Sequence, residues 1–167
     1  MKFTFKIWIL IILFILLICS IIFFPIRQTE VSKTNFIASS SFFSNYPQGS
    51  VIIEETGQRI SVAIADTTQH RVQGLSDAPA IPIGMGMLFL FEKEEQHPFW
   101  MKDMKYAIDI IWLDKNSRII YIERELKLDT YPKSFDAPLP SLYVLEMKAG
   151  ESNKLNINIG DYLSIIR

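Results

Sequence analysis

Cysteine and histidine are almost absent from this sequence of 167 residues. The one cysteine, Cys19, lies inside a long apolar run, so the rest of the chain has no thiol for a disulfide or a thiolate nucleophile. The two histidines, His70 and His97, lie outside any metalloprotease, nucleophile-elbow or phosphate-loop pattern. These absences exclude a disulfide framework and argue against catalysis by a cysteine or by a Ser-His-Asp triad.

An excess of basic residues is also lacking. The chain has 17 basic and 18 acidic residues, and without Lys2 and Lys6 at its start 15 basic and 18 acidic residues remain, a net charge of −3. These charges are interspersed, as on an ordinary solvated surface. A mildly acidic domain without a basic patch is a poor binder of nucleic acid, so we expect no nucleic-acid partner.

Residues 7–24 form the longest apolar run, interrupted only by Ser20. As a helix, eighteen residues rise about 27 Å, close to the roughly 30 Å hydrocarbon core of a bilayer. Lys2 and Lys6 precede the run, which favours a cytoplasmic N-terminus and a domain on the extracytoplasmic side. We therefore expect residues 1–26 to anchor the protein in a membrane. The alternative is a cleaved signal sequence, but no small-x-small cleavage site follows the run.

Residues 27–49 are polar, rich in Ser and Asn, and show no helical or strand periodicity. Pro47 and Gly49 are typical of a linker. The sequence thus predicts an anchor or signal at 1–26, a polar linker at 27–49 and one domain at 50–167.

From residue 51 on, short runs of β-branched and aromatic residues alternate with turn residues. The runs cover residues 51–54, 59–64, 87–91, 99–101, 108–113, 118–123, 142–147 and 162–166. Asp66 or Thr67 can cap a short helix at 68–73 that Gly74 ends, and a second short helix is expected at 151–155. The pattern predicts a mostly β fold, an antiparallel β-sandwich or barrel-like domain with one or two short helices.

Five ordered sequence blocks resemble the DUF192 family of small β-rich domains. The blocks are Arg-x-x-Gly-Leu at 71–75, Gly-Met-Leu-Phe at 86–89, Phe-Trp-Met-Lys at 99–102, Ile-Asp-Ile at 108–110 and Tyr-Val-Leu-Glu at 143–146. Ala149-Gly150 and Gly160-Asp161 follow them. The resemblance covers residues 60–166 and implies a β-rich, sandwich-like fold, commonly with an N-terminal anchor or signal. It implies no reaction.

Several ionisable residues lie within or beside apolar strands. Arg71, Lys102, Asp109 and Glu146 allow two interpretations. One, on which ligand binding depends, is a polar cluster at one end of the domain, where Trp100 offers an aromatic face to a sugar or another planar ligand. The other, which we favour for the four charged residues, is a set of structural ion pairs that fixes the ends of helix and strands; Trp100 is equally suited to the core.

A second set of residues has soft ligand atoms. Met85, Met87, His97 and Met101 supply thioethers and an imidazole, which suit Cu(I). The more ordinary interpretation is that methionine fills gaps in the core, which we favour.

These residues support three hypotheses for function. The preferred one is a non-catalytic, membrane-tethered domain that binds a small ligand or an envelope protein, without a cofactor. The second is a hydrolase of an envelope glycan or ester that uses Asp109 and Glu146 as its carboxylate pair, which requires both in one cleft. The third is Cu(I) binding by the methionine and histidine set.

Overall fold

The computed structural model describes residues 38–167, so the predicted anchor at 1–26 lies outside the described residues. The folded unit begins at Ala38, residues 38–43 are helical, and Phe43 and Tyr46 are buried. The latter part of the segment expected to be a linker is therefore packed on the domain. Within residues 38–167, no helix has the length and apolar character needed to cross a membrane.

Most of the described chain forms β-strands. The strands are β1 (Gln48–Ile53), β2 (Arg59–Ala65), β3 (Met85–Glu95), β4 (Phe99–Trp100), β5 (Ile108–Leu113), β6 (Ile119–Leu126), β7 (Ser134–Phe135), β8 (Ser141–Lys148) and β9 (Leu163–Ile166). The short helices are α2 (Thr68–Gln73), α3 (Glu151–Lys154) and the 3-10 turn η1 (Leu128–Thr130). The mostly β prediction, with few short helices, is confirmed.

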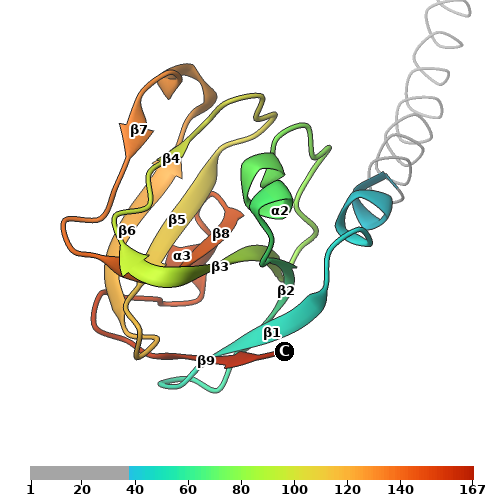
Figure 1. Ribbon diagram of the computed structural model, residues 1–167. Coiled ribbons are helices and arrows are strands. Elements are labelled where there is room, and N and C mark those ends of the chain that lie inside the picture. The colour runs from blue at the N-terminus through green and yellow to red at the C-terminus, as the bar shows by residue number, and fades with distance from the viewer. Residues whose placement is uncertain (1–37) are drawn as a thin grey trace, which may run out of the picture. The chain divides into compact units, whose positions relative to one another are not determined.

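Seven strands form one curled sheet rather than two stacked sheets. Their order is β6-β5-β8-β3-β2-β1-β9, and β4 pairs with β7 separately. The ends of the large sheet approach each other, as Figure 1 shows, because a bridge joins Arg118 to Tyr162. Ile119 N donates to Asp161 O over 2.8 Å and Leu163 N to Ser117 O over 3.0 Å. The result is a half-barrel.

The expectation of purely antiparallel pairing is wrong at β2 and β3, which run parallel. Parallel neighbours need a long crossover, and residues 66–84 provide it with α2 inside. Thr67 caps this helix by accepting a bond from His70 N at 3.1 Å, and Gly74 ends it with a φ of 49°. The β2-α2-β3 unit therefore places α2 over one face of the sheet.

Both faces of the sheet are covered by apolar side chains. Every residue of β5 is buried, as in a strand packed on both sides. Alternation directs Ile110 and Trp112 into one apolar cluster and Ile111 and Leu113 into the other. Any ionisable residue in the middle of β5 or β8 is consequently buried, whichever face it takes.

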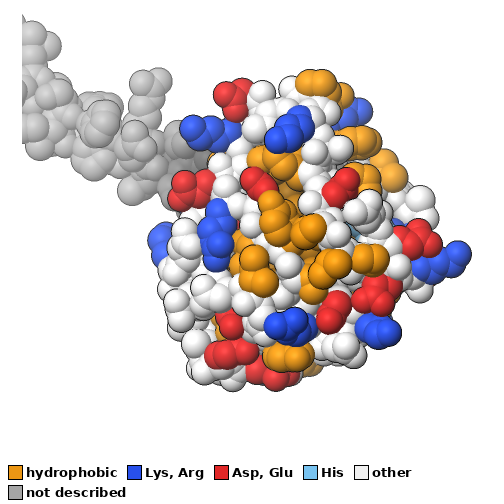
Figure 2. All heavy atoms as spheres, turned by 90° about the vertical axis from the view of Figure 1, so that its left-hand side faces the viewer, with side chains coloured by type: hydrophobic (Ala, Val, Ile, Leu, Met, Phe, Trp, Pro, Cys, Tyr) orange, Lys and Arg blue, Asp and Glu red, His pale blue; other side chains and the backbone are white. Residues whose placement is uncertain are grey.

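The connection between β6 and β8 carries β7 along the outside of the domain. Leu128, Tyr131 and Leu139 in this connection are all exposed. Figure 2 shows hydrophobic side chains in a band on this side of the molecule, with acidic and basic side chains around it. Nothing in the described residues covers this band.

Candidate functional site

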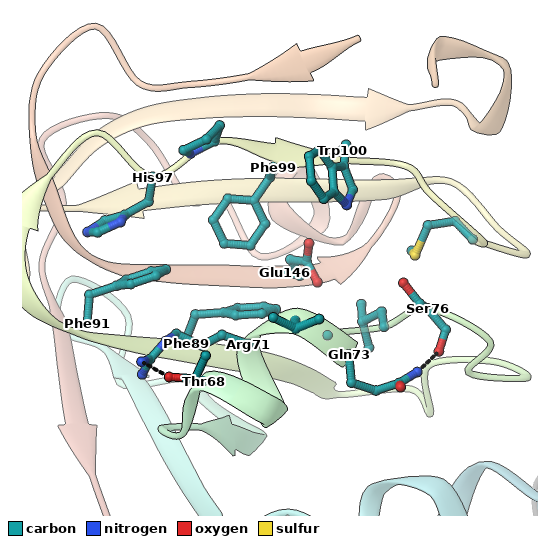
Figure 3. A pocket seen from close by; sticks show the side chains of 15 residues that line it. Thr68, Arg71, Gln73, Ser76, Phe89, Phe91, His97, Phe99, Trp100 and Glu146 are labelled. Carbon is teal, nitrogen blue, oxygen red and sulfur yellow. Dashed lines mark hydrogen bonds between the residues drawn. The ribbon is translucent and has the colours of Figure 1, made fainter. Parts of the chain in front are cut away.

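A pocket of about 300 Å³ lies between α2, β3 and the segment that leads into β4. Figure 3 shows Phe99 and Trp100 along one side, Phe89 and α2 along the other, and Glu146 of β8 between them. A volume of this size is at the lower end of the range for small-molecule sites.

Two exposed hydrophobic side chains belong to the pocket lining. Val72 on α2 is 79% exposed and Trp100 on β4 is 55% exposed, although both are large and apolar. An exposed indole beside a cavity gives a planar ligand a surface on which to stack.

Aromatic rings form the deeper walls of the pocket. Phe89 and Phe99 meet edge to face, with their centroids 4.9 Å apart. Phe99 in turn lies edge-on to Trp112, 6.1 Å away in the core. These contacts hold the walls against the core, so the pocket is largely formed before a ligand arrives.

Glu146 is the buried acid of this pocket. It is 4% exposed, and its Oε2 atom has no hydrogen-bond partner among the described residues. Burial raises the pKa of this carboxyl to about 8. A buried polar atom without a partner is costly, and its position beside a cavity marks it as an atom available to a ligand.

Arg71 also lines the pocket, but its guanidinium is bonded elsewhere. Its Nη1 atom donates to Asp66 O at 2.8 Å and to Leu90 O at 2.9 Å, and the group lies 5.5 Å from the Phe91 ring centroid. In Figure 3 the guanidinium lies beside Thr68, whose Oγ1 accepts from Nη2 at 3.5 Å. Arg71 therefore joins α2 to β3 and forms no ion pair with Glu146.

The remaining polar side chains of the lining also bond within the chain. Gln73 Nε2 donates to Ser76 O at 2.7 Å, and Ser76 Oγ donates to Lys102 O at 3.0 Å. The His97 ring stacks on Phe91, and its Nε2 lies 3.1 Å from Lys93 O. Against these bonded groups, the free Oε2 of Glu146 stands out.

Asp109 occupies a different environment. In the β5–β8 register Asp109 is opposite Met147, whereas Glu146 is opposite Ile110. Directly paired residues point to the same face, so Asp109 and Glu146 point to opposite faces of the sheet. The hydrolase hypothesis fails on this geometry, because the two carboxyls do not share a cleft.

The Asp109 carboxylate is fully engaged by backbone and side-chain donors. Oδ1 accepts from Glu125 N at 2.8 Å and Gly150 N at 3.1 Å. Oδ2 accepts from Ser152 N at 3.0 Å and from Ser152 Oγ at 2.7 Å. These bonds fasten the start of α3 to β5 and β6.

The structure thus brings together three of the five residues expected at a ligand site. Arg71, Trp100 and Glu146 line the pocket, Asp109 lies on the other face, and Lys102 is exposed outside the lining. The sequence pattern did not single out the lining residues Val72, Gln73, Phe89 and Phe99. The Gly-Met-Leu-Phe and Phe-Trp-Met-Lys blocks contain Phe89 and Phe99, but nothing in those blocks shows that α2 crosses over them.

The residues considered for Cu(I) occupy mostly apolar surroundings. Met87 and Met101 are buried in the core cluster beneath the pocket, and Met85 packs against it. His97 lies in the pocket lining, stacked on Phe91. Among residues 38–167, no three His, Cys, Asp or Glu side chains lie close enough together to hold a metal ion.

Comparisons with known proteins agree with this architecture. The family model DUF192, described as "Uncharacterized ACR", matches residues 51–165. The chain is similar to a crystal structure from Sinorhizobium meliloti 1021, named as a candidate transcription regulator, with a TM-score of 0.66 and 27% identity over 72% of this chain and 95% of that one. It is also similar to a protein of unknown function from Novosphingobium aromaticivorans DSM 12444, with a TM-score of 0.61 and 25% identity over 70% and 83% of the two chains. No curated protein matches the chain.

Proposed function

The chain belongs to the DUF192 family, and we propose that its domain is a non-catalytic module that binds a small organic ligand in the pocket around Glu146. The observation that supports this most is the unpartnered Oε2 atom of a buried carboxyl beside a cavity with aromatic walls. Convergence of apolar surface with a few polar groups is typical of small-molecule sites.

A binding role is favoured over catalysis because the other ionisable side chains of the described lining, Arg71 and His97, are bonded elsewhere. Asp109 lies behind the sheet, and the guanidinium of Arg71 is bonded to two carbonyl oxygens. General acid–base catalysis requires a partner group within reach of the reacting atoms. Glu146 is therefore assigned to ligand recognition.

We propose further that residues 1–26 hold the domain on the extracytoplasmic side of a membrane, as the apolar run and its flanking lysines suggest. The test is fractionation of the full-length protein with alkaline carbonate, followed by protease treatment of intact spheroplasts. Retention in the membrane with digestion of the domain is expected. Release by carbonate, or protection from the protease, would contradict the proposed location.

A nucleic-acid function is not proposed, although one similar structure is named as a candidate transcription regulator. The part of this chain after Lys6 has a net charge of −3, with 15 basic and 18 acidic residues. Binding to DNA depends on neutralising phosphates with Lys and Arg, so an acidic domain is poorly suited to it.

Ligand binding is tested with a fragment screen on the full-length protein, read by ligand-observed NMR and by tryptophan fluorescence. Trp100 is exposed whereas Trp112 is buried, so a ligand in the pocket is expected to change mainly the Trp100 emission. Val72→Arg introduces a long charged side chain beside the pocket and should abolish binding. Ile159→Arg is the matched control, because Ile159 is 59% exposed and lies outside the lining. Fragments that bind both variants equally, or no binding fragment at all, would overturn the proposal.

A further inference from the structure

Given the proposed function, on which this inference rests, we propose that the ligand is a small organic ammonium ion whose N–H groups donate to Glu146 and whose hydrocarbon part lies against Phe99 and Trp100. Glu146 supplies an acceptor with a free Oε2 atom. The pocket supplies aromatic surface on the same side, as Figure 3 shows. Carboxylates and aromatic faces both attract cations, and together they form a recurrent ammonium site.

The described part of the chain supplies no cation to Glu146. Among the described residues, no lysine, arginine or histidine forms an ion pair with this carboxyl. Arg71 is the cationic residue of the lining, and its Nη1 atom is bonded to Asp66 O and Leu90 O. Residues 38–167 therefore provide no counterion for the ionised form of Glu146, and a cationic ligand in the pocket would provide it.

The titratable groups around Glu146 come from several elements. Arg71 approaches from α2, and His97 lies in the lining before β4. Tyr46, before β1, and Tyr106, before β5, are close enough for the charge of Glu146 to raise their pKa values further, after burial as the main cause. The neighbouring strands β3 and β5 place the uncharged residues Met87 and Ile110 opposite Glu146. None of these groups neutralises a carboxylate at Glu146.

A neutral polyhydroxy ligand fits these observations less well. Recognition of several hydroxyl groups needs several free polar side chains, since each buried hydroxyl must find a partner. Gln73, Ser76 and His97 already have bonds within the chain. Among the described lining residues, the buried side-chain atom without a hydrogen-bond partner is Glu146 Oε2, so the pocket is suited to a ligand with one strongly donating group.

Binding of an ammonium ion by this carboxyl has a defined proton balance. The free protein holds Glu146 protonated at neutral pH, because burial raises its pKa to about 8. An ammonium ion beside the carboxyl lowers that pKa, so the carboxyl releases its proton to the buffer and the ion pair forms. Affinity should consequently rise up to about tenfold per pH unit as pH approaches 8, and then level off until the amine itself loses its proton.

The experiment is isothermal titration calorimetry of the full-length protein with benzylamine and its uncharged counterpart, benzyl alcohol. Titrations at pH 7 in two buffers of different ionisation enthalpy measure the protons released, and a series from pH 6 to pH 9 measures the pH dependence. We expect benzylamine to bind at least about tenfold more tightly than the alcohol at pH 8 and to release close to one proton at pH 7.

Glu146→Gln is the decisive variant, because glutamine keeps the shape of the side chain and cannot become charged. It should weaken benzylamine binding about tenfold or more at pH 8 and leave benzyl alcohol binding within about threefold. Glu151→Gln is the matched control, since Glu151 is a buried carboxyl outside the pocket lining. That variant should leave both affinities unchanged.

Two outcomes would overturn the ammonium proposal and can be told apart from failure of the proposed function. If benzyl alcohol binds as tightly as benzylamine, with an affinity that falls above pH 8, the protonated carboxyl is the donor and the ligand class is neutral. If neither probe binds at millimolar concentration, an ammonium ligand is excluded. In both cases, fragments that bind the wild type and fail to bind Val72→Arg would still support the pocket as a ligand site.

Discussion

Asp109 and Glu146 lie on neighbouring strands of one sheet, and both are almost fully buried. The Asp109 carboxylate accepts four hydrogen bonds, three of them from backbone N–H groups. The Oε2 atom of Glu146 accepts none within the described chain and lies beside a cavity. Burial alone therefore does not separate a structural acid from a binding one.

Their partners explain the difference. A carboxylate that accepts several backbone N–H bonds is stabilised in its charged form and fixes the segments that donate to it. Ionisation of a buried carboxyl without such donors destabilises the folded protein. Functional sites are where proteins retain groups with such a cost. We infer that Asp109, on one face of the sheet, stabilises the fold and that Glu146, on the other face, binds the ligand.

The largest effect is expected from Asp109→Ala. The substitution leaves three backbone N–H groups and the Ser152 hydroxyl without their acceptor, and we expect a loss of about 5 kcal/mol in the free energy of unfolding. Urea unfolding followed by circular dichroism measures it. Asp109→Asn keeps one oxygen acceptor and should lose roughly half as much. A loss below about 1 kcal/mol for Asp109→Ala would contradict the structural role.

Glu146→Gln is expected to change how stability depends on pH. The carboxyl has a pKa of 4.5 when unperturbed and about 8 in the folded protein, so between these values the folded state holds one more proton than the unfolded state. Stability of the wild type should fall by about 1.4 kcal/mol per pH unit, roughly 4 kcal/mol from pH 5 to pH 8. The variant should lose this part of the slope, so its stability relative to that of the wild type should rise from pH 5 to pH 8.

Urea unfolding of both proteins at pH 5, 6, 7 and 8 checks this prediction. Glu92→Gln is the control, because Glu92 is exposed on β3 and its replacement should leave the slope unchanged. Equal slopes for wild type and Glu146→Gln would show that Glu146 is already ionised at neutral pH, and the comparison with Asp109 would then fail.

Local sequence signals predicted most elements of this fold. The strand expected at 108–113 and the helix at 68–73 match β5 and α2, because a continuous apolar run and a Thr cap with a closing Gly are strong local signals. The parallel pairing of β2 with β3 was not predicted. Pairing direction depends on where the crossover lies in space, and periodicity along the chain does not record that.

The site was predictable in composition but not in arrangement. Asp109 and Glu146 both stand out as acids within apolar strands, and the sequence alone leaves open the face to which each points. The β5–β8 register decides this by placing Met147 opposite Asp109. The hydrogen bonds from Glu125 N and Gly150 N to Asp109 join segments far apart in sequence, so no local sequence pattern predicts them.

A smaller effect is expected from Ser152→Ala, which removes one of the four bonds to Asp109. Ser152 is fully buried, and its Oγ donates to Asp109 Oδ2 at 2.7 Å. The free energy of unfolding should fall by about 1–2 kcal/mol, since a bond to a charged acceptor is lost but the backbone donors remain. Chemical denaturation at pH 7 measures the loss. No change would mean that the three backbone donors suffice and that the hydroxyl adds nothing.

The smallest effect is expected from Tyr106→Phe, on the face with Glu146. The Tyr106 hydroxyl is buried and has no hydrogen-bond partner among the described residues, so its removal should leave stability unchanged or raise it by up to about 1 kcal/mol. Tyr46→Phe is the matched comparison, because the Tyr46 hydroxyl donates to Gly74 O at 3.2 Å and its removal should cost about 1 kcal/mol. If Tyr106→Phe is instead the more damaging of the two in urea unfolding, the Tyr106 hydroxyl has a partner in solution. A water molecule bonded to both the Tyr106 hydroxyl and Glu146 Oε2 would explain that result. The Glu146 carboxyl would then have hydrogen-bond partners, as the Asp109 carboxylate has, and the contrast between the two acids would disappear.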